Sequence, residues 1–185
     1  MALDLWKTGY HEARVLAALI ADPNKATKKL LHQWVNDLNN WAVCDACCGE
    51  FFCKTKFAYE LPFMWAKSKK EYVRRAGFVM IAELAVHDKH AADGKFENFF
   101  PLLMKYSTDD RNFVKKAINW ALRQIGKRNF ELHKKSLTLA FQIQNIPSST
   151  AKWITSDAIR ELQSPKTLNI ISKRMKFRRS NRLHY

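Results

Sequence analysis

Apolar residues recur along the chain at spacings of three and four positions, and alternating runs with a period of two are missing. Breaks divide this pattern into segments of about eight to twenty residues, the ordinary length of helices. The pattern therefore predicts an all-α fold. The predicted helices cover 2–8, 10–21, 25–37, 40–54, 56–67, 69–87, 95–107, 110–127, 130–144 and 149–163, with a short one at 166–171.

Eight of these helices form four consecutive pairs, at 25–54, 56–87, 95–127 and 130–163, whose starts lie 31 to 39 residues apart. This quasi-period is typical of repeats built from two antiparallel helices. Stacked pairs bury their apolar faces against each other and produce a curved α-solenoid with a concave groove. The repeats share little sequence, and a compact helical bundle is the alternative architecture.

The chain has 185 residues, which suffices for one domain with a sizeable core. We expect a single helical-repeat domain over 1–171 and a flexible tail over 172–185, because the tail is basic and low in apolar residues. A DNA-tethering arm and a merely solvated tail are both open for this segment.

Charge gives the first indication of function. The sequence holds 32 Lys and Arg against 17 Asp and Glu, a formal net charge of +15. Seven of these basic residues follow Glu161 with no acid among them, which still leaves 25 against 17 before that point. A basic surface attracts polyanions, and nucleic acid is the usual one, although an acidic membrane or an acidic protein would also fit.

No apolar run is long enough to cross a bilayer, and the first residues lack the basic and apolar regions of a signal peptide. We therefore expect no membrane partner and a cytoplasmic protein that is nucleoid-associated when bound to DNA. We expect a monomer.

The four cysteines lie within ten residues, at Cys44, Cys47, Cys48 and Cys53. Thiols along one helix cannot surround a metal tetrahedrally, and a thioredoxin-like motif needs a preceding strand. We predict reduced, mostly buried thiols that pack as small hydrophobic groups, with no metal site.

The second helices of three consecutive pairs carry residues suited to chemistry. Trp41 and Asp45 are four residues apart and share one helical face. Arg74 and Arg75 precede a strongly apolar stretch, and Trp120 stands among basic residues. If the second helices line the groove, Trp41, Asp45, Arg75 and Trp120 converge there.

Such a group of residues fits the hydrolysis of an N-glycosidic bond. A carboxylate stabilises the positive charge that develops on the sugar and orients the attacking water. Aromatic faces attract a cationic purine, and an arginine matches both a carboxylate and a phosphate. The plainer alternatives are a core role for each tryptophan, a helix cap for Asp45 and a salt bridge for Arg75.

The sequence resembles the AlkD-like DNA alkylation repair family, which are glycosylases built from HEAT-like helical repeats. The resemblance is carried in order by Leu5 to Arg14, Trp41-Ala42-Val43-Cys44-Asp45, Val73-Arg74-Arg75-Ala76-Gly77 and Phe113 to Arg123. It covers most of the chain with compatible spacing and implies a right-handed solenoid whose basic concave face binds duplex DNA.

The resemblance also implies roles for particular residues. Trp41 and Trp120 match the aromatic residues that contact the lesion, and Asp45 matches the catalytic carboxylate. Arg75 matches the arginine that engages this carboxylate and the DNA backbone. Further DNA contacts are expected from Arg74, Lys116, Arg123 and Lys127.

The activity implied is excision of cationic N3- and N7-alkylated purines from duplex DNA without a cofactor and without the deep base flipping of other glycosylases. Relatives carry a further helical region before Leu5-Trp6, so a truncated start and a short variant are both open. Two other functions remain: a non-catalytic helical-repeat DNA-binding or scaffold protein, and an adaptor that holds an acidic peptide.

Overall fold

The computed structural model describes the backbone of residues 1–182 and the side chains of residues 1–174, and no β-strand occurs among them. The all-α prediction is confirmed. Contacts divide the chain into two compact units, Met1–Leu84 and Ala85–Tyr185, and helix α6 (Glu71–His87) begins in the first and ends in the second. The single-domain boundary at 171 and the handedness of the solenoid stay predictions.

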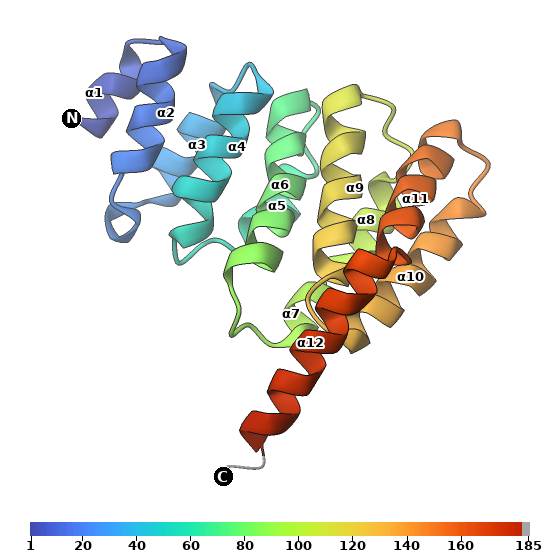
Figure 1. The fold of residues 1–185 in the computed structure, drawn as a ribbon. Helices are drawn as coiled ribbons and strands as arrows, with labels where there is room; N and C mark the ends of the chain where they lie inside the picture. The colour runs from blue at the N-terminus through green and yellow to red at the C-terminus, as the bar shows by residue number, and fades with distance from the viewer. Residues whose placement is uncertain (183–185) are drawn as a thin grey trace. The chain divides into compact units, whose positions relative to one another are not determined.

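The first unit contains five helices before α6, together with two short 3-10 helices. In chain order these are α1 (Ala2–Lys7), α2 (His11–Ile20), η1 (Pro23–Lys25), α3 (Lys28–Asn36), α4 (Trp41–Glu50), η2 (Phe52–Lys54) and α5 (Leu61–Trp65). Helix α2 packs against both α1 and α4 (Figure 1). Between α1 and α2, Gly9 has a φ of +75°, a conformation that glycine adopts without strain.

Most tryptophans of the first unit lie in an aromatic row in its core, formed by Trp6, Trp34, Phe51, Phe52 and Trp65. The rings of Trp6 and Trp34 stack with centroids 4.1 Å apart, and the row continues at centroid distances of 5.2, 5.7 and 5.1 Å. The indole N–H of Trp6 donates to Asp37 at 2.8 Å, so the buried polar group is satisfied. The three tryptophans of this row are therefore core residues, which is the usual role of a tryptophan in a folded protein.

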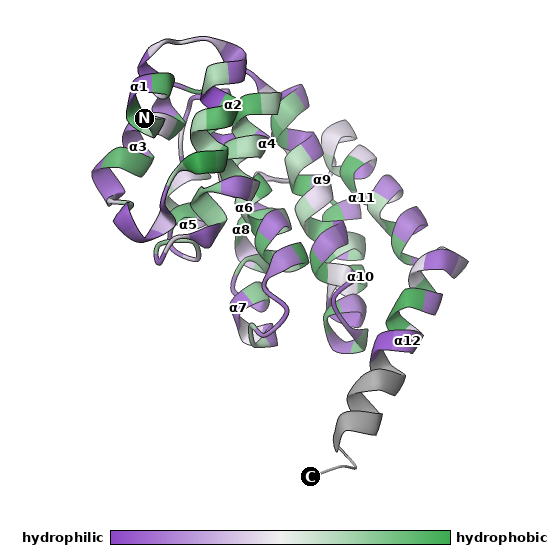
Figure 2. Ribbon diagram, turned by 60° about the vertical axis from the view of Figure 1, so that its left-hand side comes forward, coloured by the Kyte–Doolittle hydropathy of each residue, from purple (hydrophilic) through white to green (hydrophobic). Residues whose placement is uncertain are grey.

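The second unit contains α7 (Asp93–Glu97), α8 (Phe100–Tyr106), α9 (Asn112–Gly126), α10 (Phe130–Gln144), α11 (Ser149–Leu162) and α12 (Pro165–Arg182). Helices α9, α10 and α11 pack on one another (Figure 1). Figure 2 shows hydrophilic and hydrophobic residues in turn along α9 and α11, as expected for helices with one buried face. Helix α11 runs parallel to α9, since the successive partners of Asn119 and Lys127 on it are Ile154 and Glu161.

Polar side chains cap the first turns of four helices, three of them at predicted breaks, whereas Thr27 lies two residues inside the helix predicted at 25–37. Thr27, Asn40, Asn129 and Ser148 each accept a hydrogen bond from the backbone N–H three residues later, at 3.2, 2.9, 2.9 and 3.3 Å. These caps satisfy N–H groups that have no partner inside the helix. The starts of α3, α4, α10 and α11 are therefore encoded locally.

Prolines account for two differences from the predicted helices. The helix predicted at 95–107 is broken into α7 and α8, because Pro101 lacks an N–H and fits only the first turn of α8. The helix predicted at 56–67 is reduced to α5, whose first turn contains Pro62.

The tail also differs from its prediction. The short helix predicted at 166–171 continues as α12 to Arg182, so the boundary placed at 172 falls inside a helix. Thr167 and Ile171 are buried and hold the first half of α12 against the unit. Flexibility of the tail stays a prediction, and residues 183–185 lie outside the described residues. No helix among residues 1–182 is both long and apolar enough to span a bilayer.

Candidate functional site

Trp41 and Asp45 lie one turn apart on α4, which begins at Trp41 after the Asn40 cap. Trp41 is 53% exposed, whereas Trp6, Trp34 and Trp65 of the aromatic row are at most 3% exposed. A half-exposed indole contributes less hydrophobic stabilisation than a buried one, and about half of the Trp41 surface is available for contact with another molecule. Asn40 rather than Asp45 caps the helix, which leaves the carboxylate for other contacts.

Arg75 of α6 meets Asp45 with two parallel hydrogen bonds. Its Nε donates to Oδ1 at 2.9 Å and its Nη2 to Oδ2 at 2.7 Å. The Arg75 side chain is 8% exposed and that of Asp45 is 24% exposed. This bidentate geometry fixes the plane of the partly exposed carboxylate, and each oxygen keeps a second lone pair that can accept from a further donor.

Burial raises the pKa of Asp45 above its ordinary value of 3.8, and the hydrogen bond and charge of Arg75 oppose this effect without cancelling it. The folded state then binds the proton of Asp45 more tightly than the unfolded chain does. The free energy of unfolding therefore decreases as pH rises from the unfolded pKa of Asp45 through its higher folded pKa. The carboxylate is thus held in place by the surrounding structure rather than being a source of stability.

The clustered cysteines help to hold α4 against α6. The thiol of Cys44 donates to the carbonyl of Tyr72, and that of Cys48 to the carbonyl of Ala76, each at 3.7 Å. Cys44, Cys47 and Cys48 are fully buried, as expected for small packing groups, whereas Cys53 is half-buried. The Asp45–Arg75 pair therefore lies between two helices that these thiol hydrogen bonds also connect.

Four predicted DNA-binding or lesion-contacting residues share one face of α9 in the second unit. Lys116, Trp120, Arg123 and Lys127 follow one another at spacings of four, three and four residues. Lys116 is exposed and Trp120 is half-buried. The face thus combines a half-buried indole with three cations.

Two of these cations are already paired with α11. Glu161 receives hydrogen bonds from Arg123 and from Lys127, the second at 2.6 Å, and Asp157 lies 3.9 Å from Arg123. Burial would raise the pKa of Glu161, but the bonds from Lys127 and Arg123 outweigh burial and lower it. A phosphate bound by Arg123 or Lys127 would have to share them with Glu161, an interaction that the charge pattern did not predict.

Sequence reasoning missed Trp153, which is 43% exposed on α11. The ammonium of Lys115 lies 5.3 Å from the centre of its ring. The signal was present, since Trp153 occupies the second helix of the last pair as Trp120 does in the pair before it.

Of the four residues predicted to converge, Asp45 and Arg75 are in contact, and Trp41 lies one turn from Asp45 on α4. Trp41, Asp45 and Arg75 lie together within Met1–Leu84, whereas Trp120 belongs to the second unit and its approach to the other three stays a prediction. Arg74 is half-buried on α6 beside Arg75, and its contact with DNA is likewise a prediction.

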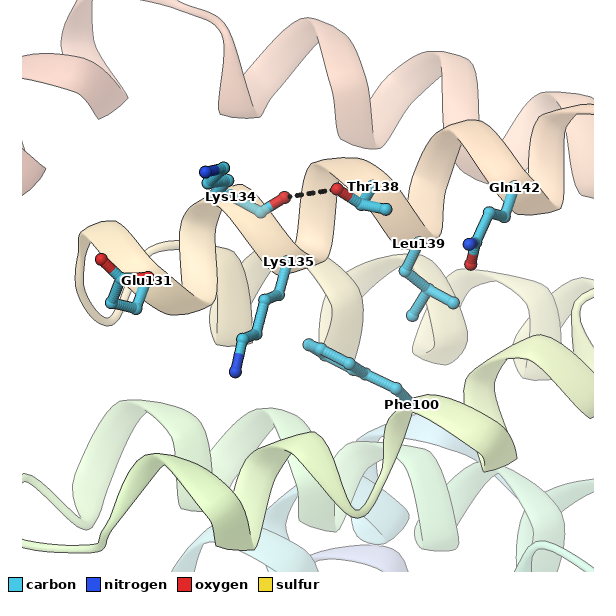
Figure 3. Close-up of a pocket in the computed structure, with 7 residues that line it drawn as sticks. All are labelled: Phe100, Glu131, Lys134, Lys135, Thr138, Leu139 and Gln142. Atoms are coloured by element: carbon cyan, nitrogen blue, oxygen red, sulfur yellow. Dashed lines mark hydrogen bonds between the residues drawn. The ribbon is translucent and has the colours of Figure 1, made fainter.

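A pocket of about 390 Å³ lies between α8 and α10 in the second unit (Figure 3). None of its lining residues belongs to the predicted site. They are Phe100, Glu131, Lys134, Lys135, Thr138, Leu139 and Gln142. Among the residues whose side chains are described, no group of three or more His, Cys, Asp or Glu could hold a metal ion.

Comparison with known proteins agrees with this architecture. A solved structure is similar at a TM-score of 0.67 and 18% identity, over 86% of this chain and 73% of that chain. It is described as a new family of proteins related to the HEAT-like repeat DNA glycosylases, with affinity for branched DNA structures. No curated protein matches the sequence. Residues 1–162 match the DNA alkylation repair enzyme family, to which this chain therefore belongs.

Proposed function

We propose that the protein is a DNA glycosylase that hydrolyses the N-glycosidic bond of cationic N3- or N7-alkylated purines in duplex DNA. The observation that carries this proposal is the carboxylate of Asp45, oriented by two hydrogen bonds from Arg75 and one helical turn from the half-exposed Trp41. Membership in the DNA alkylation repair enzyme family supports it.

The chemistry requires little of the protein beyond electrostatics. When the bond between C1′ and the purine nitrogen breaks, its electron pair neutralises the cationic base, which leaves without being protonated. Positive charge then develops on the sugar, and the Asp45 carboxylate stabilises it. A water that donates a hydrogen bond to Asp45 attacks C1′ and transfers a proton to the Asp45 carboxylate, which later releases it to solvent, so that an abasic site remains.

The aromatic residues would recognise the charge of the substrate. The indole face of Trp41 attracts a cationic purine nucleotide more strongly than a neutral one, especially once water is displaced. Trp120 would supply a second such face from α9. Arg75 holds the carboxylate, and basic residues including Arg74, Lys116, Arg123 and Lys127 would bind phosphates, so that affinity falls as salt rises.

Release of N7-methylguanine from methylated duplex DNA tests the proposal under single-turnover conditions. We expect release by the wild-type protein and a loss of at least about a hundredfold in Asp45→Asn, because the amide is neutral while it can still accept from Arg75. Asp110→Asn, the same change at an exposed residue, is the matched control and should release base at the wild-type rate. Equal rates for wild type and Asp45→Asn would remove Asp45 from the mechanism.

A second candidate is non-catalytic binding of branched DNA. The described affinity of the similar structure for branched DNA favours it. The Asp45–Arg75 ion pair also has a structural role that requires no catalysis. Competition between a four-way junction and a linear duplex of equal length separates the two functions. Strong preference for the junction without any base release would establish this second function in place of the first.

A further inference from the structure

The last helix begins as a packed element and continues as a strongly basic one. Thr167 and Ile171 are buried, whereas Lys173 and Arg174 are exposed. From 173 to 182 the sequence has six Lys and Arg and no acid, all within α12. The basic sequence of α12 therefore follows directly after the part of the helix that Thr167 and Ile171 pack against the second unit.

Arg174 fixes this run to the end of α9. Its guanidinium donates to the carbonyl of Lys127 and, at 3.5 Å, to that of Arg128. Carbonyls at a helix C-terminus lack partners within the helix and carry its negative partial charge, so a guanidinium stabilises that end. Lys127 is also the last member of the basic face of α9, and the two basic segments consequently meet at this turn.

Lys89 adds a further exposed cation at the same place. The pKa of Lys89 is lowered by partial burial and by the nearby charges of Arg174 and Arg128. Arg128 is engaged with the carbonyls of Ala85 and Ala91 and covers the ring of Phe96, so it is structural. Positive charges that lie close together repel one another, and a bound anion reduces this repulsion.

We propose that Lys89, Lys173 and helix α12, whose sequence is basic through Arg182, provide a second phosphate-binding surface, which holds the backbone of duplex DNA. This C-terminal basic surface includes none of the candidate site residues. It rests on the DNA binding of the proposed function, not on its chemistry.

The spacing of charge favours DNA over a membrane. A helix rises about 1.5 Å per residue, so the basic run spans roughly 14 Å, along which duplex DNA presents one phosphate charge per about 1.7 Å of its axis. Membrane-surface helices need a broad apolar face, whereas Met175 and Phe177 are the only large apolar residues between 172 and 182. The basic run thus has phosphates to neutralise and little apolar surface to insert.

The test is the salt dependence of binding to an undamaged duplex by the full-length protein. In Lys89→Gln/Lys173→Gln/Lys176→Gln, the slope of log K against log salt should become shallower by about 2 to 3, since each lost phosphate contact removes about 0.9. The control, Lys95→Gln/Lys105→Gln/Lys134→Gln, removes the same charge from exposed lysines on α7, α8 and α10 and should keep the wild-type slope. An equal change in both variants, or no change in either, would overturn the proposal.

Two further measurements separate this surface from the proposed activity. At saturating DNA in low salt, the triple variant should release N7-methylguanine at the wild-type rate. If the wild-type protein releases base but the triple variant keeps the wild-type salt slope, the basic surface is contradicted and the glycosylase is not. If the triple variant has a shallower slope but the wild-type protein releases no base, the glycosylase is contradicted and the basic surface is not. Loss of binding to phosphatidylserine vesicles with an unaltered DNA slope would assign α12 to membranes and also overturn the proposal.

Discussion

Arg75 holds Asp45 from the neighbouring helix, with Nε and Nη2 each bonded to a different carboxylate oxygen at 2.9 and 2.7 Å. The arginine is the more deeply buried partner, and the carboxylate keeps its contact with solvent. In this arrangement the guanidinium orients the carboxylate and opposes the rise in its pKa that burial causes.

Replacing Arg75 should therefore change the pH dependence of base release. Burial raises the pKa of Asp45, and Arg75 partly offsets this. Arg75→Gln removes the offset, so the acid limb of the single-turnover rate should move to higher pH, because the proposed hydrolysis needs the ionised carboxylate. Breaking the pair should also cost roughly 3 kcal/mol of unfolding free energy, measured by urea titration. An acid limb at the wild-type pH in Arg75→Gln would show that Arg75 does not influence the pKa of Asp45. Arg75→Lys keeps a positive charge and should return the acid limb part of the way to its wild-type pH.

Trp41→Ala should separate binding from stability. Because the ring is 53% exposed, its loss should change the unfolding free energy by less than about 1 kcal/mol. Affinity for a methylated duplex should fall by roughly tenfold, the value of one aromatic contact with a base. Trp34→Ala provides the contrast, since its ring is 1% exposed and its removal should cost about 3–5 kcal/mol. Unchanged lesion affinity in Trp41→Ala would exclude the indole from recognition.

Glu161→Gln should strengthen DNA binding. The change removes the carboxylate that pairs with Arg123 and Lys127, and thereby makes both cations available to phosphates. The slope of log K against log salt should steepen by about 1 to 2, at a cost in stability below about 1 kcal/mol. Glu131→Gln, which alters an exposed acid on α10, should leave the slope unchanged. A slope equal to that of wild type would mean that these cations do not reach DNA.

The cysteines should react slowly in the folded protein. Burial raises the pKa of Cys47 and Cys48 well above the ordinary value, and burial with the charge of Glu83 raises that of Cys53 to about 11. Because the thiolate is the reactive form, these three thiols should resist a disulfide reagent at pH 8 and react within minutes in urea. Rapid reaction of these three thiols in the folded protein would contradict the prediction.

The sequence by itself determined the helical class and most helix positions. The three- and four-residue spacing and the local caps at Thr27, Asn40, Asn129 and Ser148 act over single turns, so they can be recognised in a linear pattern. It also placed Trp41 and Asp45 on one face, because helix periodicity alone fixes that relation.

Tertiary structure decided which charges meet. Nothing local distinguishes Arg75, paired with a carboxylate 30 positions away, from Arg123, paired with Glu161 of a later helix, or from Arg128, buried over Phe96. It also decided that Trp6 and Trp34 stack in the core while Trp41 stays open to solvent. These outcomes depend on packing between helices distant in the chain, where a side chain gains or loses its partners according to its neighbours and not its own sequence context.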